Sequence, residues 1–122
     1  MARSGTLARV GLDVELFMFE QEGTSFQRRR SVELATVGDT GFRFAQAVER
    51  AQRRRSTPML DRIDPYGAME LSSGEMPQFL SELDQMLTAA VDQGERKVIE
   101  AVRNLAERCS NDQNLALRLV GD

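Results

Sequence analysis

The chain has 122 residues, a size typical of one domain, and its single cysteine excludes an intramolecular disulfide. It contains no histidine, which excludes zinc sites of the Cys/His type and nucleophilic Ser-His-Asp or Cys-His arrangements. The net charge of −3 is unevenly spread: residues 28–62 carry nine arginines against four acids, and residues 63–122 carry eleven acids against five bases.

The lack of cysteine pairs favours a reducing compartment. No apolar run near the N-terminus has signal-peptide length, and no stretch approaches the ~20 apolar residues of a membrane span. These features predict a cytoplasmic protein. We expect residues 1–7 to be disordered and residues 8–122 to form a single α+β domain.

The first predicted element is a strand. Apolar and polar residues alternate over residues 10–16, which is typical of a half-buried strand. Phe17 and Phe19 then occupy the formerly polar face, so either both faces are covered there or a bulge resets the register. Residues 20–25 are predicted as a turn, and residues 26–36 as a second strand that completes a hairpin.

A helix is predicted over residues 42–55, with Asp39 or Thr40 as its capping residue. Its apolar residues recur at i, i+3, i+4 and i+7: Phe44, Ala47, Val48 and Ala51. Another face carries arginines: Arg43, Arg50 and Arg54. Pro58 ends this helix, because the residue before a proline avoids the α region.

Residues 59–63 are predicted as a short helical turn. The sequence Asp64-Pro65-Tyr66-Gly67 is typical of a turn, and it leads into a short strand over residues 66–71. Residues 115–120 alternate again and predict a terminal strand.

Between these two strands, residues 75–109 carry a continuous apolar stripe. One helix of that length or two helices that break near Gly94 both fit, and two are favoured by the size of the domain. Ser72 and Glu75 imitate a capping box, but Pro77 argues that the helix begins at Gly74 instead.

The predicted order is therefore β-β-α-β-α-α-β. It indicates an α+β fold: a small, mostly antiparallel sheet of three to four strands, with three helices packed on one face.

Few residues offer chemistry. Cys109 lies on an apolar helix stripe and is interpreted as a buried hydrophobe. Asp61 and Asp64 are a candidate carboxylate pair for acid–base work, or else they serve a local turn and pair with arginines. The arginine runs 28–30 and 53–55 either contact phosphates or form a solvated face that pairs with the acidic half.

Three segments resemble a group of small bacterial proteins. They are Leu60–Gly67 with its Ile-Asp-Pro-Tyr-Gly turn, Met76-Pro77-Gln78, and the ending Leu117–Asp122. The resemblance covers residues 58–122, and the group has no established activity. It implies a turn that leads into a strand and helix and a terminal apolar strand that ends in Gly-Asp. It transfers no catalytic residue and directs attention to the turn.

The sequence favours a non-catalytic protein-interaction protein, immunity-like or adaptor-like, whose partner is another protein. A homodimer is also compatible with the sequence. Two alternatives are a carboxylate-based enzyme and a nucleic-acid binder that uses the arginine runs. We expect no cofactor and no metal. The residues predicted to bind are Arg62, Asp64, Tyr66 and Gly67.

Overall fold

The computed structural model describes residues 11–21, 29–64 and 66–121. These residues form one antiparallel sheet with the strand order β2-β1-β4-β3. Its strands are β1 (Leu12–Gln21), β2 (Arg29–Val37), β3 (Ala68–Ser72) and β4 (Leu115–Gly121). The helices of the described chain are α2 (Arg43–Arg54), α3 (Met76–Thr88) and α4 (Gln93–Ser110). The predicted fold class and element order are confirmed. Residues 1–7 and most of the turn predicted over 20–25 lie outside the described residues.

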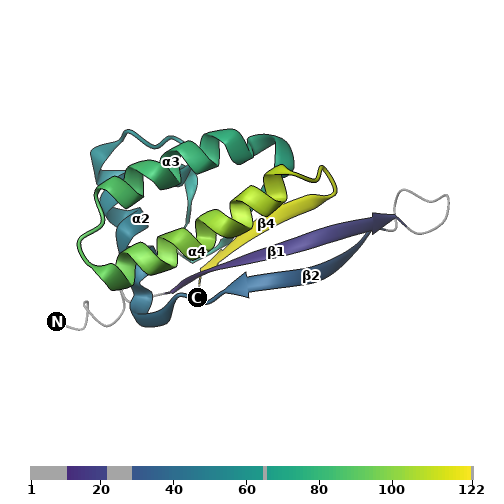
Figure 1. Cartoon of the computed structure of the whole chain (residues 1–122), viewed down its shortest axis with the longest axis horizontal. Helices are drawn as coiled ribbons and strands as arrows, with labels where there is room; N and C mark the ends of the chain where they lie inside the picture. Colours follow the sequence, from purple (N-terminus) through teal and green to yellow (C-terminus); the bar gives the residue numbers. More distant parts are fainter. Residues whose placement is uncertain (1–10, 22–28, 65, 122) are drawn as a thin grey trace.

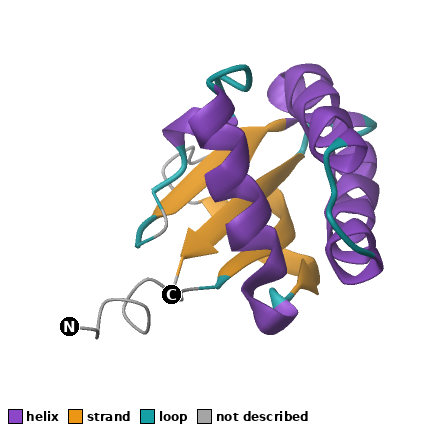
Figure 2. Cartoon of the chain, turned by 90° about the vertical axis from the view of Figure 1, so that its left-hand side faces the viewer, coloured by secondary structure: helices purple, strands orange, loops and turns teal. Residues whose placement is uncertain are grey.

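The helices lie on one side of the sheet (Figures 1 and 2). Alternate strand residues point towards them and join a single core. The largest fully buried apolar side chains come from both layers: Phe44, Phe79, Leu16, Leu60, Leu71, Met76, Leu83, Met86, Ile99, Leu117 and Leu119. No described helix covers the other face of the sheet, which we call the open face (Figure 1).

Strand β1 keeps its alternation from Leu12 to Phe19. Leu16 faces the core, and Phe17 and Phe19 lie on the open face. The pairing of β1 with β2 shifts between Leu16 and Phe17, which leaves Leu34 of β2 as the extra residue of a bulge. The alternative of a bulge that resets the register of β1 is therefore wrong, because the bulge lies in the partner strand β2.

Asp39 joins the start of α2 to β1. Its Oδ1 accepts the N–H of Phe44 at 2.7 Å, and its Oδ2 accepts the N–H groups of Ala45 and Leu12, each at 2.9 Å. The carboxylate thus satisfies backbone donors that the first helical turn leaves without partners. Of the two predicted capping residues, Asp39 and not Thr40 has this role.

A buried carboxylate organises the segment after α2. Glu82 of α3 is fully buried, and its two oxygens accept the N–H groups of Met59 at 3.0 Å and Leu60 at 2.9 Å. Gln78 donates from Nε2 to the same carboxylate at 2.6 Å. These bonds hold the start of the 3₁₀ turn η2 (Leu60–Arg62), which is the short helical turn predicted from the sequence.

The apolar stripe of residues 75–109 belongs to two helices, which is the alternative that the size of the domain favoured. Asp92 is the N-cap of α4 and accepts the N–H of Glu95 at 2.8 Å. The break therefore falls at residues 89–92, and Gly94 lies in the first turn of α4 and not at the break.

The rejection of the capping box was wrong. Glu75 accepts the N–H of Ser72 at 2.8 Å around the 3₁₀ turn η3 (Ser73–Glu75). Pro77 still falls in the first turn of α3, where its missing N–H costs nothing. Both signals are satisfied because a 3₁₀ turn separates the cap from the α-helix.

No helix in the described part of the chain combines the length and the apolarity that a bilayer crossing requires.

Candidate functional site

The predicted binding residues lie in and beside a turn that joins η2 to β3. Arg62 ends η2 and is exposed, as are Asp64 and Tyr66. The Oδ1 of Asp64 accepts the N–H of Tyr66 at 2.9 Å, and its carbonyl accepts the N–H of Gly67 at 3.1 Å. Asp64 therefore stabilises the turn through its own backbone neighbours.

Gly67 has a structural reason for its place in this turn. A Cβ at this position would lie 3.1 Å from Oδ2 of Asp64, which is tighter than an ordinary contact. The carbonyl of Gly67 accepts the N–H of Gly121 at 2.8 Å and so connects the turn to the end of β4. The geometry assigns this turn a part in aligning β3 with β4.

The candidate carboxylate pair lies at the surface. Asp61 and Asp64 are both exposed, and Asp64 is engaged in its turn. An acid–base dyad needs carboxyl groups whose environments separate their pKa values, which burial or a shared site provides. Neither of these two side chains is buried.

The second arginine run has a local explanation. Arg53 and Arg54 end α2, and Arg55 is its C-cap, where positive charge is favoured by the helix dipole. Arg53 also pairs with Glu49 at 3.1 Å. All three arginines are exposed.

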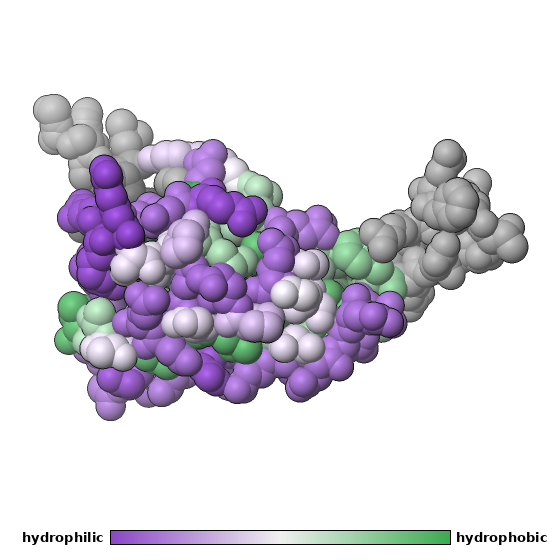
Figure 3. Space-filling model, turned by 90° about the horizontal axis from the view of Figure 1, so that it is seen from above, coloured by the Kyte–Doolittle hydropathy of each residue, from purple (hydrophilic) through white to green (hydrophobic). Residues whose placement is uncertain are grey.

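Figure 3 shows the helical side of the molecule, where hydrophilic side chains cover most of the surface and apolar ones form small separate areas. The side chains of residues 28–30 lie outside the described part of the chain.

Cys109 is fully buried in the core, as predicted. Burial raises the pKa of its thiol from 9.0 to about 11, and Asp112 adds to the effect. A thiol with a raised pKa carries little thiolate at neutral pH and is a poor nucleophile.

The open face carries a different cluster. Arg118 of β4 places its guanidinium carbon 4.8 Å from the ring centre of Phe17, and the rings of Phe17 and Phe19 meet edge to face at 5.0 Å. Glu15 lies 3.9 Å from Nη1 of Arg118. Phe17 is only 3% exposed, whereas the side chain of Arg118 is 43% exposed. The cluster therefore presents a fixed cation over a covered aromatic ring. We call these four residues the open-face cluster.

Carboxylates flank the open-face cluster on neighbouring strands. Glu33 of β2 is opposite Phe17, and Glu70 of β3 is opposite Arg118 in the strand pairing. Both are exposed. With Glu15, three glutamates accompany one arginine on the described part of this face. The described part of the open face is therefore acidic around its aromatic centre.

The sequence contained a signal for this cluster that was not used. Phe17 and Phe19 stand on the outer face of a clear alternation, and Arg118 stands on the outer face of another. Their meeting depends on the pairing of β1 with β4, which no local pattern reveals.

The chain thus belongs to the class of two-layer α+β proteins with a four-stranded antiparallel sheet that is helix-covered on one face. No family model, curated protein or solved structure matched it in the comparisons. The resemblance of the Ile63–Gly67 turn to small bacterial proteins stays a prediction.

Proposed function

We propose that this chain is a non-catalytic protein-binding module of the immunity or adaptor type. The open face of its sheet binds a basic surface of the partner protein. The observation that carries the proposal is the open-face cluster with its flanking glutamates. Aromatic residues and arginine are enriched at protein interfaces. The carboxylates supply the complementary charge for a basic partner.

The geometry of Arg118 supports this use of the face. Its guanidinium rests on Phe17 and lies near Glu15, so the side chain is ordered before a partner arrives. An ordered side chain loses less conformational entropy on binding than a mobile one. The surrounding glutamates also disfavour phosphate, which argues against nucleic acid on this face.

Charge reversal on the open face tests the proposal. Proteins captured from the cells that make this chain are compared for the native protein and for the Glu33→Lys/Glu70→Lys variant. A specific partner is expected to be retained by the native protein and lost by the variant. Its affinity for the native protein, measured after purification, is expected to fall as salt increases.

Glu100→Lys is the matched control, because Glu100 is an exposed glutamate on α4, away from the sheet. This variant is expected to retain the partner. Loss of the partner by Glu100→Lys alone, or equal retention by all variants, contradicts binding at the open face.

Nucleic-acid binding is a second candidate, and one observation favours it. Arg53, Arg54 and Arg55 are exposed together at the end of α2. A mobility-shift assay at low salt with DNA and RNA tests it. Binding that weakens linearly with log salt, and that Arg54→Glu weakens, supports this candidate. Absence of any shift dismisses it.

A further inference from the structure

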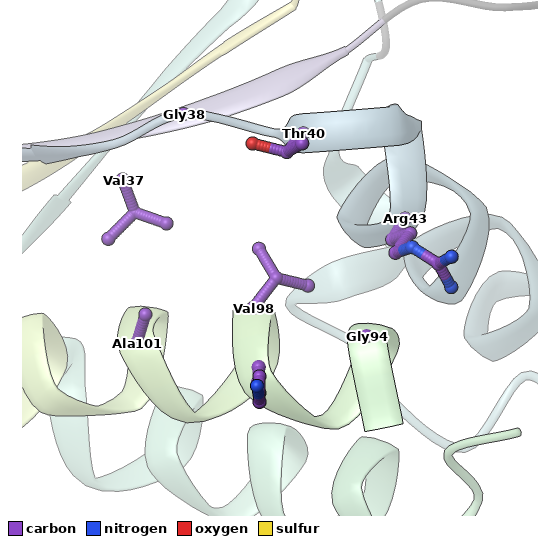
Figure 4. Close-up of a pocket in the computed structure, with 8 residues that line it drawn as sticks. Val37, Gly38, Thr40, Arg43, Gly94, Val98 and Ala101 are labelled. Atoms are coloured by element: carbon purple, nitrogen blue, oxygen red, sulfur yellow. The ribbon is translucent and has the colours of Figure 1, made fainter. Parts of the chain in front are cut away.

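A groove lies on the helical side of the sheet, between the end of β2 and the first turns of α4 (Figure 4). It has a volume of about 320 Å³ and is lined by Val37, Gly38, Thr40, Arg43, Gly94, Lys97, Val98 and Ala101. Five of these eight residues have no polar side-chain atom. Figure 4 shows Val37, Val98 and Ala101 directed into the same space, with the hydroxyl of Thr40 facing it.

The charged groups of the groove have one sign. Arg43 and Lys97 line it, and no carboxylate is among its described lining residues. Lys97 is exposed and forms no ion pair with any described residue. Asp92 offsets the charge of Arg43, so Lys97 leaves the rim positive.

Arg43 is fixed in place at one end of the groove. Its Nη1 donates to both carboxylate oxygens of Asp92 at 2.8 Å. A Cβ at Gly94 would lie only 2.7 Å from the guanidinium carbon, so this glycine lets the guanidinium lie against the first turn of α4. The groove therefore exists with one ordered cation and needs no rearrangement to form.

We propose that this groove is a second docking site, which takes an acidic and apolar segment of a partner protein. The apolar floor receives an aliphatic or aromatic side chain, and Lys97 pairs with a neighbouring carboxylate of that segment. Thr40, Arg43 and Lys97 are exposed, so the rim is open to solvent. An open rim admits a continuous chain, whereas small-molecule sites bury most of their ligand.

The inference extends the proposed protein-binding function, because the groove and the open face have opposite charge and lie on different sides of the sheet. A molecule with two such surfaces can hold two different partners at once, as an adaptor does. The two surfaces are tested separately, and the Glu33→Lys/Glu70→Lys variant is expected to bind the groove probe normally.

The probe is a fluorescent decapeptide that alternates leucine and glutamate. Control peptides replace glutamate by lysine or leucine by serine. We expect the acidic, leucine-containing peptide to bind about tenfold more tightly than either control peptide, because one control removes the buried apolar contact and the other replaces attraction to Lys97 by repulsion. Amide signals of residues 37–40 and 94–101 are expected to shift in NMR spectra. Equal binding of all peptides, or no shift of these signals at about 1 mM peptide, overturns the proposal.

Lys97 gives the test a second readout, because it is the single lysine of the chain. Acetylation of Lys97 by an amine-reactive ester, measured by mass spectrometry, is expected to slow when the peptide is bound. Lys97→Glu is expected to weaken peptide binding about tenfold. Arg96→Glu makes the same change of charge on α4 outside the groove lining and is expected to change the affinity less than about twofold.

Two results overturn the assignment of a partner segment. Equal weakening by Lys97→Glu and Arg96→Glu shows a general charge effect. A molecular mass that rises with protein concentration, together with protection of Lys97 without peptide, shows that a second copy of this chain occupies the groove.

Discussion

Replacement of Glu82 by glutamine tests how a buried carboxylate holds the fold. The native side chain is fully buried and accepts two backbone N–H groups, from Met59 and Leu60. The amide of glutamine keeps one acceptor oxygen and presents an NH₂ group to the other N–H. One buried backbone donor then loses its partner, and the remaining bond loses its charge assistance.

The magnitude follows from these two losses. An unsatisfied buried donor costs about 1–3 kcal/mol, and hydrogen bonds to charged groups are worth more than neutral ones. Some of this cost is offset because a neutral amide is cheaper to bury than a carboxylate. We therefore expect Glu82→Gln to lower the free energy of unfolding by about 2 kcal/mol, a large part of the ~5–15 kcal/mol of a typical domain.

Urea unfolding measures this change. With a typical slope of ~1–3 kcal/mol per molar urea, the midpoint is expected to fall by about 0.7–2 M. Glu100→Gln is the matched control, because Glu100 is exposed on α4, and it should change the unfolding free energy by less than ~0.5 kcal/mol. A Glu82→Gln variant as stable as this control would refute the assigned role of the carboxylate.

Two further substitutions test the roles of Asp39 and Cys109. Asp39→Ala removes the acceptor of three backbone N–H groups. It is expected to lower the free energy of unfolding, measured in urea, by about 2 kcal/mol and to speed amide exchange at Phe44. Thr40→Ala is the control, because Thr40 does not cap the helix, and it should lower the free energy of unfolding by less than ~0.5 kcal/mol. For Cys109, the folded pKa of about 11 exceeds the ordinary 9.0, so the thiol ionises first in the unfolded chain and stability should fall as pH rises above 9. The difference in unfolding free energy between the native protein and Cys109→Ala should therefore shrink from pH 8 to pH 10; parallel pH curves would contradict a buried neutral thiol.

The sequence predicted the elements because most of them are amphipathic. The stripe of α2 and the alternation of β1 each follow from packing one side on a core, and both appear in the local sequence. The one error of detail came from competing local signals. Pro77 and Glu75 favour different helix starts, although a 3₁₀ turn accommodates both. Gly94 lies near the break, as predicted, and in the first turn of α4 it makes room for Arg43.

The candidate surfaces were beyond the sequence for a different reason. Phe17 and Arg118 lie at opposite ends of the chain, and only the pairing of β1 with β4 brings them together. The groove likewise joins Val37 to Val98 through the packing of α4 beside β2. Local patterns report which face of an element is buried, but they do not report which exposed faces become neighbours. Predicted site residues were therefore drawn from one contiguous turn, and the structure gives that turn an alignment role.

The charge segregation of the sequence separates into two parts in the structure. One part forms ion pairs within the fold: Arg43 pairs with Asp92, and Arg50 pairs with the buried Glu95. These two pairs connect α2 to the start of α4. The arginine run 53–55 takes no part in these pairs, because Arg53 pairs with Glu49 of its own helix. The other part remains at the surface as the acidic open face and the positive rim at Lys97. Charge left after the internal pairs are made is free to steer a partner, because its field extends about a Debye length, ~8 Å in physiological salt, into the solvent. The charge of the proposed partners therefore follows from the surface remainder and not from the net charge of −3.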